Sequence, residues 1–373
     1  RGALTNPESR FTNPGLQALR TIRPMHIPPE QLARLRSMGW RDDAPAAAAY
    51  AEAVDGRLAR VTEQHRSGYI VDDGEREFSV QAPAPWTRKG FAPEQRAAVG
   101  DWVRLKADED LILDWLPRFG VLKRAAAGEH YKQQLIAANI DRVLVVCGLD
   151  GDFNPRRLER YLVLVRGSGA EAVFVLTKAD QLDEEDVEMA MDVLQPLEEA
   201  GARLIALNAR SLDSVRVLHP LLGPGVTAVL VGSSGAGKST LTNALLGIER
   251  QKTNTVRAND SRGRHTTTHR ALLRLPSGGC LIDTPGMREL KLTGEETLDR
   301  SGFDRIEELA AQCRFRDCAH EREPGCAVQA ALEAEEIDPG ALSNYRKLQG
   351  ELEQARQVLK QRERQGPRGP RRR

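Results

Sequence analysis

The sequence has no apolar run close to the roughly 18–20 residues that a bilayer-spanning helix needs, and its first residues lack the apolar core of a signal peptide. Neither a membrane span nor export is therefore expected. An excess of one charge is also missing, because 54 basic side chains nearly cancel 53 acidic ones. Any nucleic-acid surface must then arise from local clusters of basic residues.

Cysteine is scarce, with five residues in a chain of 373. An odd number without an export signal indicates a reduced, cytoplasmic chain, in which clustered cysteines bind metal more often than they form disulfides. Three cysteines and a histidine follow the pattern C-x4-C-x-H-x5-C, namely Cys313, Cys318, His320 and Cys326. Three thiolates and one imidazole suit one structural Zn²⁺. Buried free cysteines are the alternative, and packing is the interpretation for Cys147 and Cys280.

The pattern along the chain predicts five parts. Residues 1–49 contain several prolines and are expected to form a partly disordered extension. Residues 50–125 hold five short runs rich in Val and Ile, which suit a small barrel of the oligonucleotide-binding (OB) type or a generic β-barrel adaptor. Residues 126–295 alternate between strands and helices, residues 296–361 are helical around the cysteine cluster, and residues 362–373 form a basic tail.

Six apolar runs mark the expected strands of the third part. They cover residues 141–149, 171–177, 203–208, 227–232, 269–275 and 280–284. Near-continuous apolar runs are typical of strands buried on both faces of a largely parallel sheet. Helical runs fit between several of them, so the pattern predicts a doubly wound α/β domain.

A phosphate-binding loop is predicted where an apolar strand meets a helical run. The segment Gly232–Ser239 fits G-x-x-x-x-G-K-[ST]. Its glycines let backbone amides turn toward phosphate oxygens, and Lys238 would contact the β and γ phosphates during catalysis. Ser239 would hold Mg²⁺ through its hydroxyl. The residues expected to bind the nucleotide here are Gly232, Ser233, Ser234, Gly235, Ala236, Gly237, Lys238, Ser239 and Thr240.

Two later segments suit a nucleotide switch. The run Asp-Thr-Pro-Gly places Asp283 where it can bind Mg²⁺ through water, and Gly286 where its amide can reach the γ-phosphate. Between the loop and this run lies the polar segment Arg262–Thr268. One of its threonines, with Thr267 as the candidate, would complete the Mg²⁺ shell only when the γ-phosphate is present. An ordinary Thr-rich turn is the alternative for that segment.

The residue that orients the attacking water is not the usual one. Many GTPases have a glutamine after the glycine of the Asp-Thr-Pro-Gly run, whereas this chain has Met287. His265 is the candidate for this catalytic role, because it is polar, titrates near neutrality and lies on the segment expected to order around the γ-phosphate. A surface histidine without a role is the alternative.

The base-reading residues are expected at the ends of two other strands. The run Thr177, Lys178, Ala179, Asp180 ends one strand, and the carboxylate of Asp180 can accept hydrogen bonds from both guanine N–H groups. Most GTPases have Asn in place of Thr177, and threonine makes fewer hydrogen bonds. A helix cap is the alternative role for Asp180. After the next strand, a backbone amide of Asn208 or Ala209 could contact the guanine oxygen.

The order of these motifs is circularly permuted, because both base-reading motifs precede the phosphate loop. In this order, and in the runs GRHTTT and DTPGMREL, the chain resembles the ribosome-small-subunit-dependent GTPase A (RsgA/YjeQ) family over about residues 50–360. The resemblance implies an OB-type barrel, a GTPase domain using GTP with Mg²⁺, and a zinc-binding helical domain. It also implies a role in late maturation of the small ribosomal subunit, with contacts to ribosomal RNA and hydrolysis stimulated by that subunit. A cytoplasmic monomer is expected.

Two other function classes stay open at this point. The chain could be an RNA-binding module that uses its nucleotide site mainly as a conformational latch, although Lys238, Ser239, Asp283 and Asp180 are all present. It could also be a P-loop ATPase or a small-molecule kinase, but that interpretation leaves Asp180 and its motif unexplained.

Overall fold

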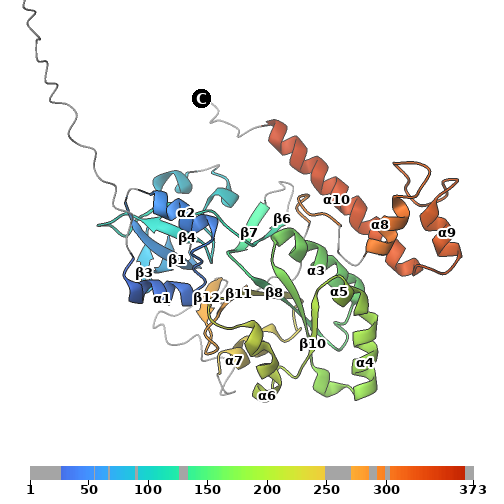
Figure 1. Ribbon diagram of the computed structural model, residues 1–373, viewed down its shortest axis with the longest axis horizontal. Coiled ribbons are helices and arrows are strands. Elements are labelled where there is room, and N and C mark those ends of the chain that lie inside the picture. Colours follow the sequence, from blue (N-terminus) through green and yellow to red (C-terminus); the bar gives the residue numbers. More distant parts are fainter. Residues whose placement is uncertain are drawn as a thin grey trace, which may run out of the picture.

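The computed structural model describes residues 27–53, 55–65, 68–88, 91–125, 133–247, 270–284, 292–298 and 303–365. Figure 1 shows a β-barrel on one side of a central α/β sheet and a helical C-terminal part on the other. In the part of the chain so described, no helix is both long and apolar enough to cross a membrane.

Two short helices precede the barrel and pack against it. Helices α1 (Pro29–Ser37) and α2 (Pro45–Glu52) each begin with a proline, whose fixed φ suits the first helical turn. The ring of Trp40, between these helices, lies edge-on to the rings of Tyr50 and Trp102, at centroid distances of 6.1 and 5.0 Å. All three rings are buried, so the two helices form part of the same core as the barrel wall.

Five short antiparallel strands form the predicted barrel. They are β1 (Arg57–Gln64), β2 (Tyr69–Asp72), β3 (Glu77–Val80), β4 (Trp102–Leu105) and β5 (Ile112–Trp115). Strand β1 pairs with β2 and β4, β2 pairs with β3, and β4 pairs with β5. A bridge between Gln81 and Leu111 joins the end of β3 to the start of β5 and closes the ring. Short turns η1 (Ala84–Thr87) and η2 (Pro93–Gln95) lie between β3 and β4.

All six strands predicted for the α/β domain are present. They are β8 (Arg142–Gly148), β9 (Glu171–Thr177), β10 (Arg203–Ala206), β11 (Thr227–Gly232), β12 (Ala271–Arg274) and β13 (Cys280–Asp283). Their order in the sheet is β10-β9-β8-β11-β13-β12. The first five run parallel, and β12 at the edge is antiparallel to β13. The sheet is therefore largely parallel, as predicted.

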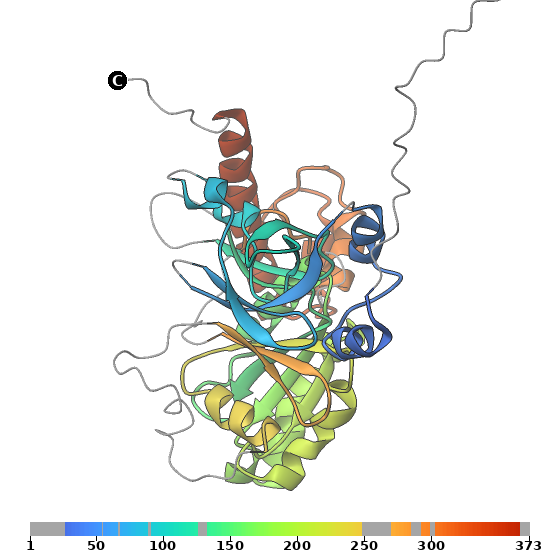
Figure 2. The same cartoon turned by 90° about the vertical axis from the view of Figure 1, so that its left-hand side faces the viewer.

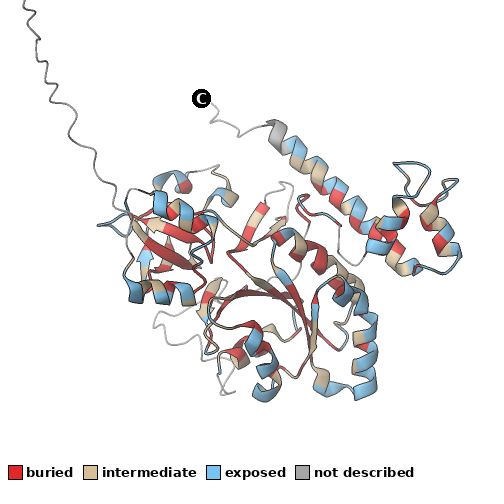
Figure 3. Ribbon diagram, viewed as in Figure 1, coloured by how far each residue is buried: buried red, intermediate tan, exposed pale blue. Residues whose placement is uncertain are grey.

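Helices cover both faces of this sheet, and its inner strands are largely buried, whereas the edge strands β10 and β12 are partly exposed (Figure 3). On β8, Val143 and Val145 pack into the core that includes α3, α4 and α5, whereas Leu144 and Val146 face the core that includes α6, α7 and η4. The helices and turns of this domain are α3 (Pro155–Ser168), η3 (Ala179–Gln181), α4 (Glu184–Val193), α5 (Gln195–Glu199), α6 (Leu212–Val215), η4 (Arg216–Leu221) and α7 (Lys238–Leu245). Successive residues of β8, β9 and β11 thus enter cores on opposite faces of the sheet, which confirms the doubly wound arrangement.

A two-stranded hairpin was not predicted. Strands β6 (Val121–Ala125) and β7 (Gln133–Ala138) pair with each other in a separate antiparallel sheet. The hairpin therefore spans the boundary predicted at residues 125 and 126, between barrel and α/β domain. Polar and charged side chains interrupt both strands, which explains why the pattern of apolar runs did not reveal them.

The C-terminal part is helical, as predicted. It consists of α8 (Asp304–Ala310), α9 (Ala327–Glu333) and the long α10 (Pro339–Gln365). On α10 the side chains of Tyr345, Leu348, Leu352 and Ala355 are buried and lie three or four residues apart, so one face of this helix packs against the protein. The helix includes the first four residues, 362–365, of the segment predicted to form the basic tail.

A buried arginine joins the barrel to the α/β sheet. Arg60, on β1, is 0% exposed, and its Nε and Nη2 donate to the carbonyl oxygens of Gly100 and Asn139 at 3.2 and 3.1 Å. Its Nη1 donates to Oγ1 of Thr227, the first residue of β11, at 2.9 Å. Strand β1 also pairs with β12, so the barrel and the sheet are continuous (Figure 2). The barrel is thus hydrogen-bonded to the strand that carries the phosphate loop.

Candidate nucleotide and metal sites

The predicted phosphate loop connects β11 directly to α7. Gly232, Gly235 and Gly237 have φ angles of 138°, 86° and 93°, a region that favours glycine. A Cβ atom on Gly232 would lie 2.1 Å from the carbonyl oxygen of Val146 on the neighbouring strand. These positions therefore require glycine, and they let the loop turn tightly before the helix begins at Lys238.

The side chain of Lys238 folds back over this loop. Its Nζ donates to the carbonyl oxygens of Gly232 and Ser233, at 2.7 and 2.5 Å. Ser239, in the first turn of α7, is exposed to solvent. A glycine-rich turn, a helix N-terminus and a lysine above them together form an arrangement that binds phosphate groups.

Thr177 lies behind the loop and not at its surface. The side chain is 0% exposed, and its hydroxyl lies 2.6 Å from the carbonyl oxygen of Ala236 and 3.3 Å from that of Cys147. Thr177 therefore connects the base-reading motif to the phosphate loop from beneath. The sequence suggested that this threonine weakens base recognition, whereas its position gives it a supporting contact within the protein.

Asp180 is exposed in the short turn η3, directly after the end of β9. The alternative role as a helix cap is wrong, because the cap of α4 is Asp183, whose carboxylate accepts the amide of Asp186 at 2.9 Å. Ala179 contacts the next strand end, since its amide donates to the carbonyl oxygen of Leu207 at 3.4 Å. The carboxylate of Asp180 is thus presented on a turn held by two strands.

The second base-reading loop lies beside the first. The amide of Leu207 donates to the carbonyl oxygen of Leu176 at 2.9 Å, which aligns the ends of β10 and β9. Asn208 shapes the turn that follows, because its Oδ1 accepts the amide of Arg210 at 2.8 Å. Ala209 is buried. The two base-reading motifs therefore meet at one edge of the sheet, as the parallel strands require.

Asp283 ends strand β13, which runs parallel to β11. The carboxylate therefore lies at the same edge of the sheet as the phosphate loop. The next residue, Thr284, is buried, and its hydroxyl donates to the carbonyl oxygen of Leu230 on β11 at 2.6 Å. The remaining predicted residues of the nucleotide site, His265, Thr267 and Gly286, lie outside the described residues.

The four predicted metal ligands come together in the C-terminal part. The ligand atoms of Cys313, Cys318, His320 and Cys326 lie within 4.8 Å of one another. The Sγ atoms of Cys313 and Cys326 are 3.8 Å apart, and they lie 3.5 and 3.6 Å from Nδ1 of His320. A tetrahedral ion with usual zinc bond lengths requires about 3.8 Å between sulfurs and about 3.5 Å from sulfur to nitrogen. The cluster can therefore hold a metal ion.

Local hydrogen bonds shape the loop that carries these ligands. The carboxylate of Glu323 accepts the amides of Ala319, Glu321 and Arg322, at 2.9, 2.8 and 3.0 Å. Hydrogen bonds from its own backbone amide and from these three lower its pKa to about 2. His320 has a φ of 58° and is buried, and burial lowers its pKa. A lowered pKa favours the neutral imidazole, which is the form that binds metal.

The two other cysteines are packing residues. Cys147 on β8 and Cys280 on β13 are both buried. Burial raises the pKa of each thiol, so each stays protonated and unreactive near neutral pH.

Comparison with known proteins places this arrangement among known GTPases. The family model described as RsgA GTPase matches residues 115–293. Proteins of Xanthomonas campestris pv. campestris and Xanthomonas axonopodis pv. citri, each named small ribosomal subunit biogenesis GTPase RsgA, are 57% and 58% identical to the chain. Each alignment covers 90% of this chain and 93% of the relative.

Two solved structures resemble the fold. YjeQ from Thermotoga maritima has 27% sequence identity and a TM-score of 0.57, covering 79% of this chain and 98% of its own. YloQ, described as a circularly permuted GTPase, has 22% identity and a TM-score of 0.55, covering 80% of this chain and 96% of its own.

Proposed function

The chain belongs to the RsgA GTPase family, and on that premise we propose that this GTPase binds the small ribosomal subunit and assists its late maturation in the cytoplasm. The observation that carries the proposal is the assembled nucleotide site. The phosphate loop, both base-reading loops and Asp283 meet at one edge of the sheet, and Thr177 connects two of them. The relatives' name, small ribosomal subunit biogenesis GTPase, supports the choice of partner.

Each side chain of the site has a role in this proposal. Asp180 accepts the two guanine N–H donors, and the amides at Asn208 and Ala209 face the guanine oxygen. Lys238 leaves the carbonyl oxygens it now contacts and binds the β and γ phosphates. Ser239 through its hydroxyl and Asp283 through water would hold Mg²⁺, which would neutralise charge that develops on the phosphates.

The attacking water needs a partner other than Met287. We assign this role to His265, on the polar segment before β12. We assign to Thr267 the contact with Mg²⁺ that forms only when the γ-phosphate is present. We also assign to Gly286 a hydrogen bond from its backbone amide to the γ-phosphate. Because methionine cannot orient water through hydrogen bonds, turnover by the free protein should be slow.

We assign one structural Zn²⁺ to the cluster of three cysteines and His320. The separations between its ligand atoms support zinc, and four protein ligands leave no open position for catalysis. The ion would hold the short helices α8 and α9 together. The helical part is then a stable platform for contacts to the ribosome.

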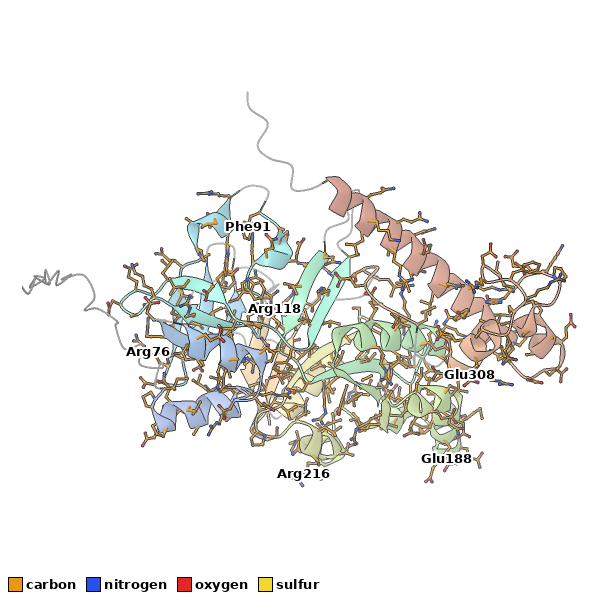
Figure 4. All side chains as sticks on the ribbon, turned by 45° about the horizontal axis from the view of Figure 1, so that its top comes forward. Arg76, Phe91, Arg118, Glu188, Arg216 and Glu308 are labelled. Atoms are coloured by element: carbon orange, nitrogen blue, oxygen red, sulfur yellow. The ribbon has the colours of Figure 1, made fainter. Side chains whose placement is uncertain are left out.

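Ribosomal RNA is expected to contact local basic and aromatic surface, since net charge is only +1. The barrel carries arginines beside aromatic rings at two places: the guanidinium group of Arg76 lies 5.1 Å from the ring of Phe78, and that of Arg96 lies 5.9 Å from the ring of Phe91. Arg76 and Phe91 lie on the outside of the barrel (Figure 4). Arginines beside aromatic rings suit stacking with single-stranded bases.

The segment 292–298 supports the idea that the bound nucleotide influences the position of the C-terminal helices. It follows the predicted switch residues in the chain and contacts α10. The buried carboxylate of Glu296 accepts the amides of Thr293 and Gly294, at 3.0 and 2.9 Å. Its carbonyl oxygen accepts Nη2 of Arg356 on α10 at 3.0 Å. A Cβ on Gly294 would lie 2.8 Å from the backbone of Ala355. A shift of this segment would therefore move α10.

GTP turnover with and without purified small subunits tests the proposal. Free protein should turn over slowly, and subunits should raise the rate by more than about tenfold, because they complete a site that lacks the usual glutamine. Lys238→Ala should abolish both rates, which controls for contaminating hydrolases. Equal rates with and without subunits would contradict the proposal and favour the latch interpretation, and equal use of ATP would contradict the guanine site.

A further inference from the structure

Lys178, in the base-reading motif, forms an ion pair that the sequence did not suggest. Its Nζ contacts Oδ2 of Asp150, in the loop after β8. The two side chains are 26% and 38% exposed, so the pair lies at the surface of the site. The lysine beside Asp150 holds the pKa of that carboxyl below its usual range, and the carboxyl is therefore ionised at neutral pH.

The backbone around Lys178 is held in an unusual conformation. Its φ is 64°, which is uncommon for a residue with a side chain and tends to occur where surrounding contacts impose it at functional sites. Gly148, the last residue of β8, makes room for the lysine. A Cβ there would lie 3.1 Å from Nζ of Lys178 and 2.7 Å from Oδ1 of Asp150. The lysine side chain thus crosses the end of β8 on its way to Asp150.

Asp150 is itself fixed in place. Its Oδ1 accepts the amide of Asp152 at 3.1 Å, and its carbonyl oxygen accepts the amide of Phe153 at 2.8 Å. The amide of Leu149 donates to the carbonyl oxygen of Thr177 at 2.8 Å, so this loop is bonded to the base-reading motif. The carboxylate is therefore a rigid anchor, and the flexible partner of the pair is the lysine.

We propose that Asp150 is a positioning residue of the nucleotide site, holding the stem of Lys178 beside Asp180 so that the stem covers the guanine base. The inference rests on the proposed guanine site. A lysine has several rotatable bonds, and the pair removes that freedom before the nucleotide binds. Affinity rises because less side-chain entropy is lost on binding.

A double-mutant cycle tests this role. Asp150→Asn keeps an oxygen for the amide of Asp152 but loses the charge, and Lys178→Met keeps the stem but loses the pair. Asp150→Asn should weaken GTP and GDP binding by about fivefold each, the scale expected of a partly exposed pair. The loss should appear in KM and not in kcat. In the Lys178→Met background, Asp150→Asn should have no further effect.

Asp213→Asn is the matched control, because Asp213 forms an exposed ion pair with Arg216 on the same domain. It should bind GTP as the unchanged protein does. Asp180→Ala separates the two claims, since it should remove the preference for GTP over ATP. If that preference persists, the guanine site itself is wrong. If the preference is lost, the guanine site stands and the role of Asp150 is tested by itself. That role is wrong if Asp150→Asn binds GTP as tightly as the unchanged protein or more tightly. It is also wrong if Asp150→Asn weakens GTP binding by the same factor in the Lys178→Met background.

Discussion

Removal of zinc from the purified protein should unfold the region of α8 and α9 and leave the nucleotide site folded. The two helices have seven residues each, too few for stability on their own. Structural zinc supplies about 10–16 kcal/mol of folding free energy in small zinc domains. The core between the sheet and helices α6 and α7, on the face next to the phosphate loop, contains none of the metal ligands. Chelation followed by hydrogen exchange should show loss of protection from about residue 304 to 333 only.

Two measurements accompany this experiment. GDP binding should persist after chelation, and added zinc should restore protection, which distinguishes metal loss from damage to the protein. Cys318→Ser should reproduce the effect of chelation. Metal analysis that finds no zinc, with the thiols of Cys313, Cys318 and Cys326 all free to react, would contradict the assignment.

Replacement of Arg60 by methionine should destabilise the barrel and the GTPase sheet together. The change leaves the carbonyl oxygen of Asn139 and the hydroxyl of Thr227 without the donor that Arg60 supplies, whereas the carbonyl oxygen of Gly100 still accepts Nδ2 of Asn139 at 3.0 Å. Each unsatisfied buried group costs about 1–3 kcal/mol, so a loss of about 2 kcal/mol or more is expected. The free energy of unfolding in urea measures it.

Arg57→Met provides the matched control on the same strand. Arg57 is 33% exposed, and its Nη2 lies 3.0 Å from Oδ1 of Asp110. Partly exposed pairs of this kind contribute about 1 kcal/mol or less. If Arg60→Met were as stable as Arg57→Met, the buried hydrogen bonds between the barrel and the strand of the phosphate loop would not stabilise the protein. That result would contradict the role given to Arg60.

Much of the fold could be predicted because the strands of the α/β domain are near-continuous apolar runs. Those at β8, β9 and β11 are buried on both faces, as such runs indicate. The β6–β7 hairpin could not be predicted, because both strands carry polar side chains. The burial of Arg60 could not be predicted either, since nothing in the local sequence distinguishes a buried arginine from an exposed one.

In the candidate site, the sequence motifs could be predicted and the contacts that support them could not. The phosphate loop and the metal cluster have fixed residue spacings, so the sequence alone located both. The support beneath them depends on residues distant in the chain: Thr177 contacts Ala236, and Asp150 contacts Lys178. Asp180 and Asp183 are both suited to capping a helix, and the three-dimensional structure shows that Asp183 caps α4.

Co-sedimentation with purified small subunits tests the central claim most directly, namely that the GTP-bound chain is the form that recognises the subunit. Binding should be tightest with a non-hydrolysable GTP analogue, weaker with GDP and weakest without nucleotide, and it should weaken as salt rises. By linkage, subunits must then raise the affinity for the GTP analogue by the same factor. Equal binding in all three states would contradict the account, because a nucleotide that does not change subunit affinity cannot switch it.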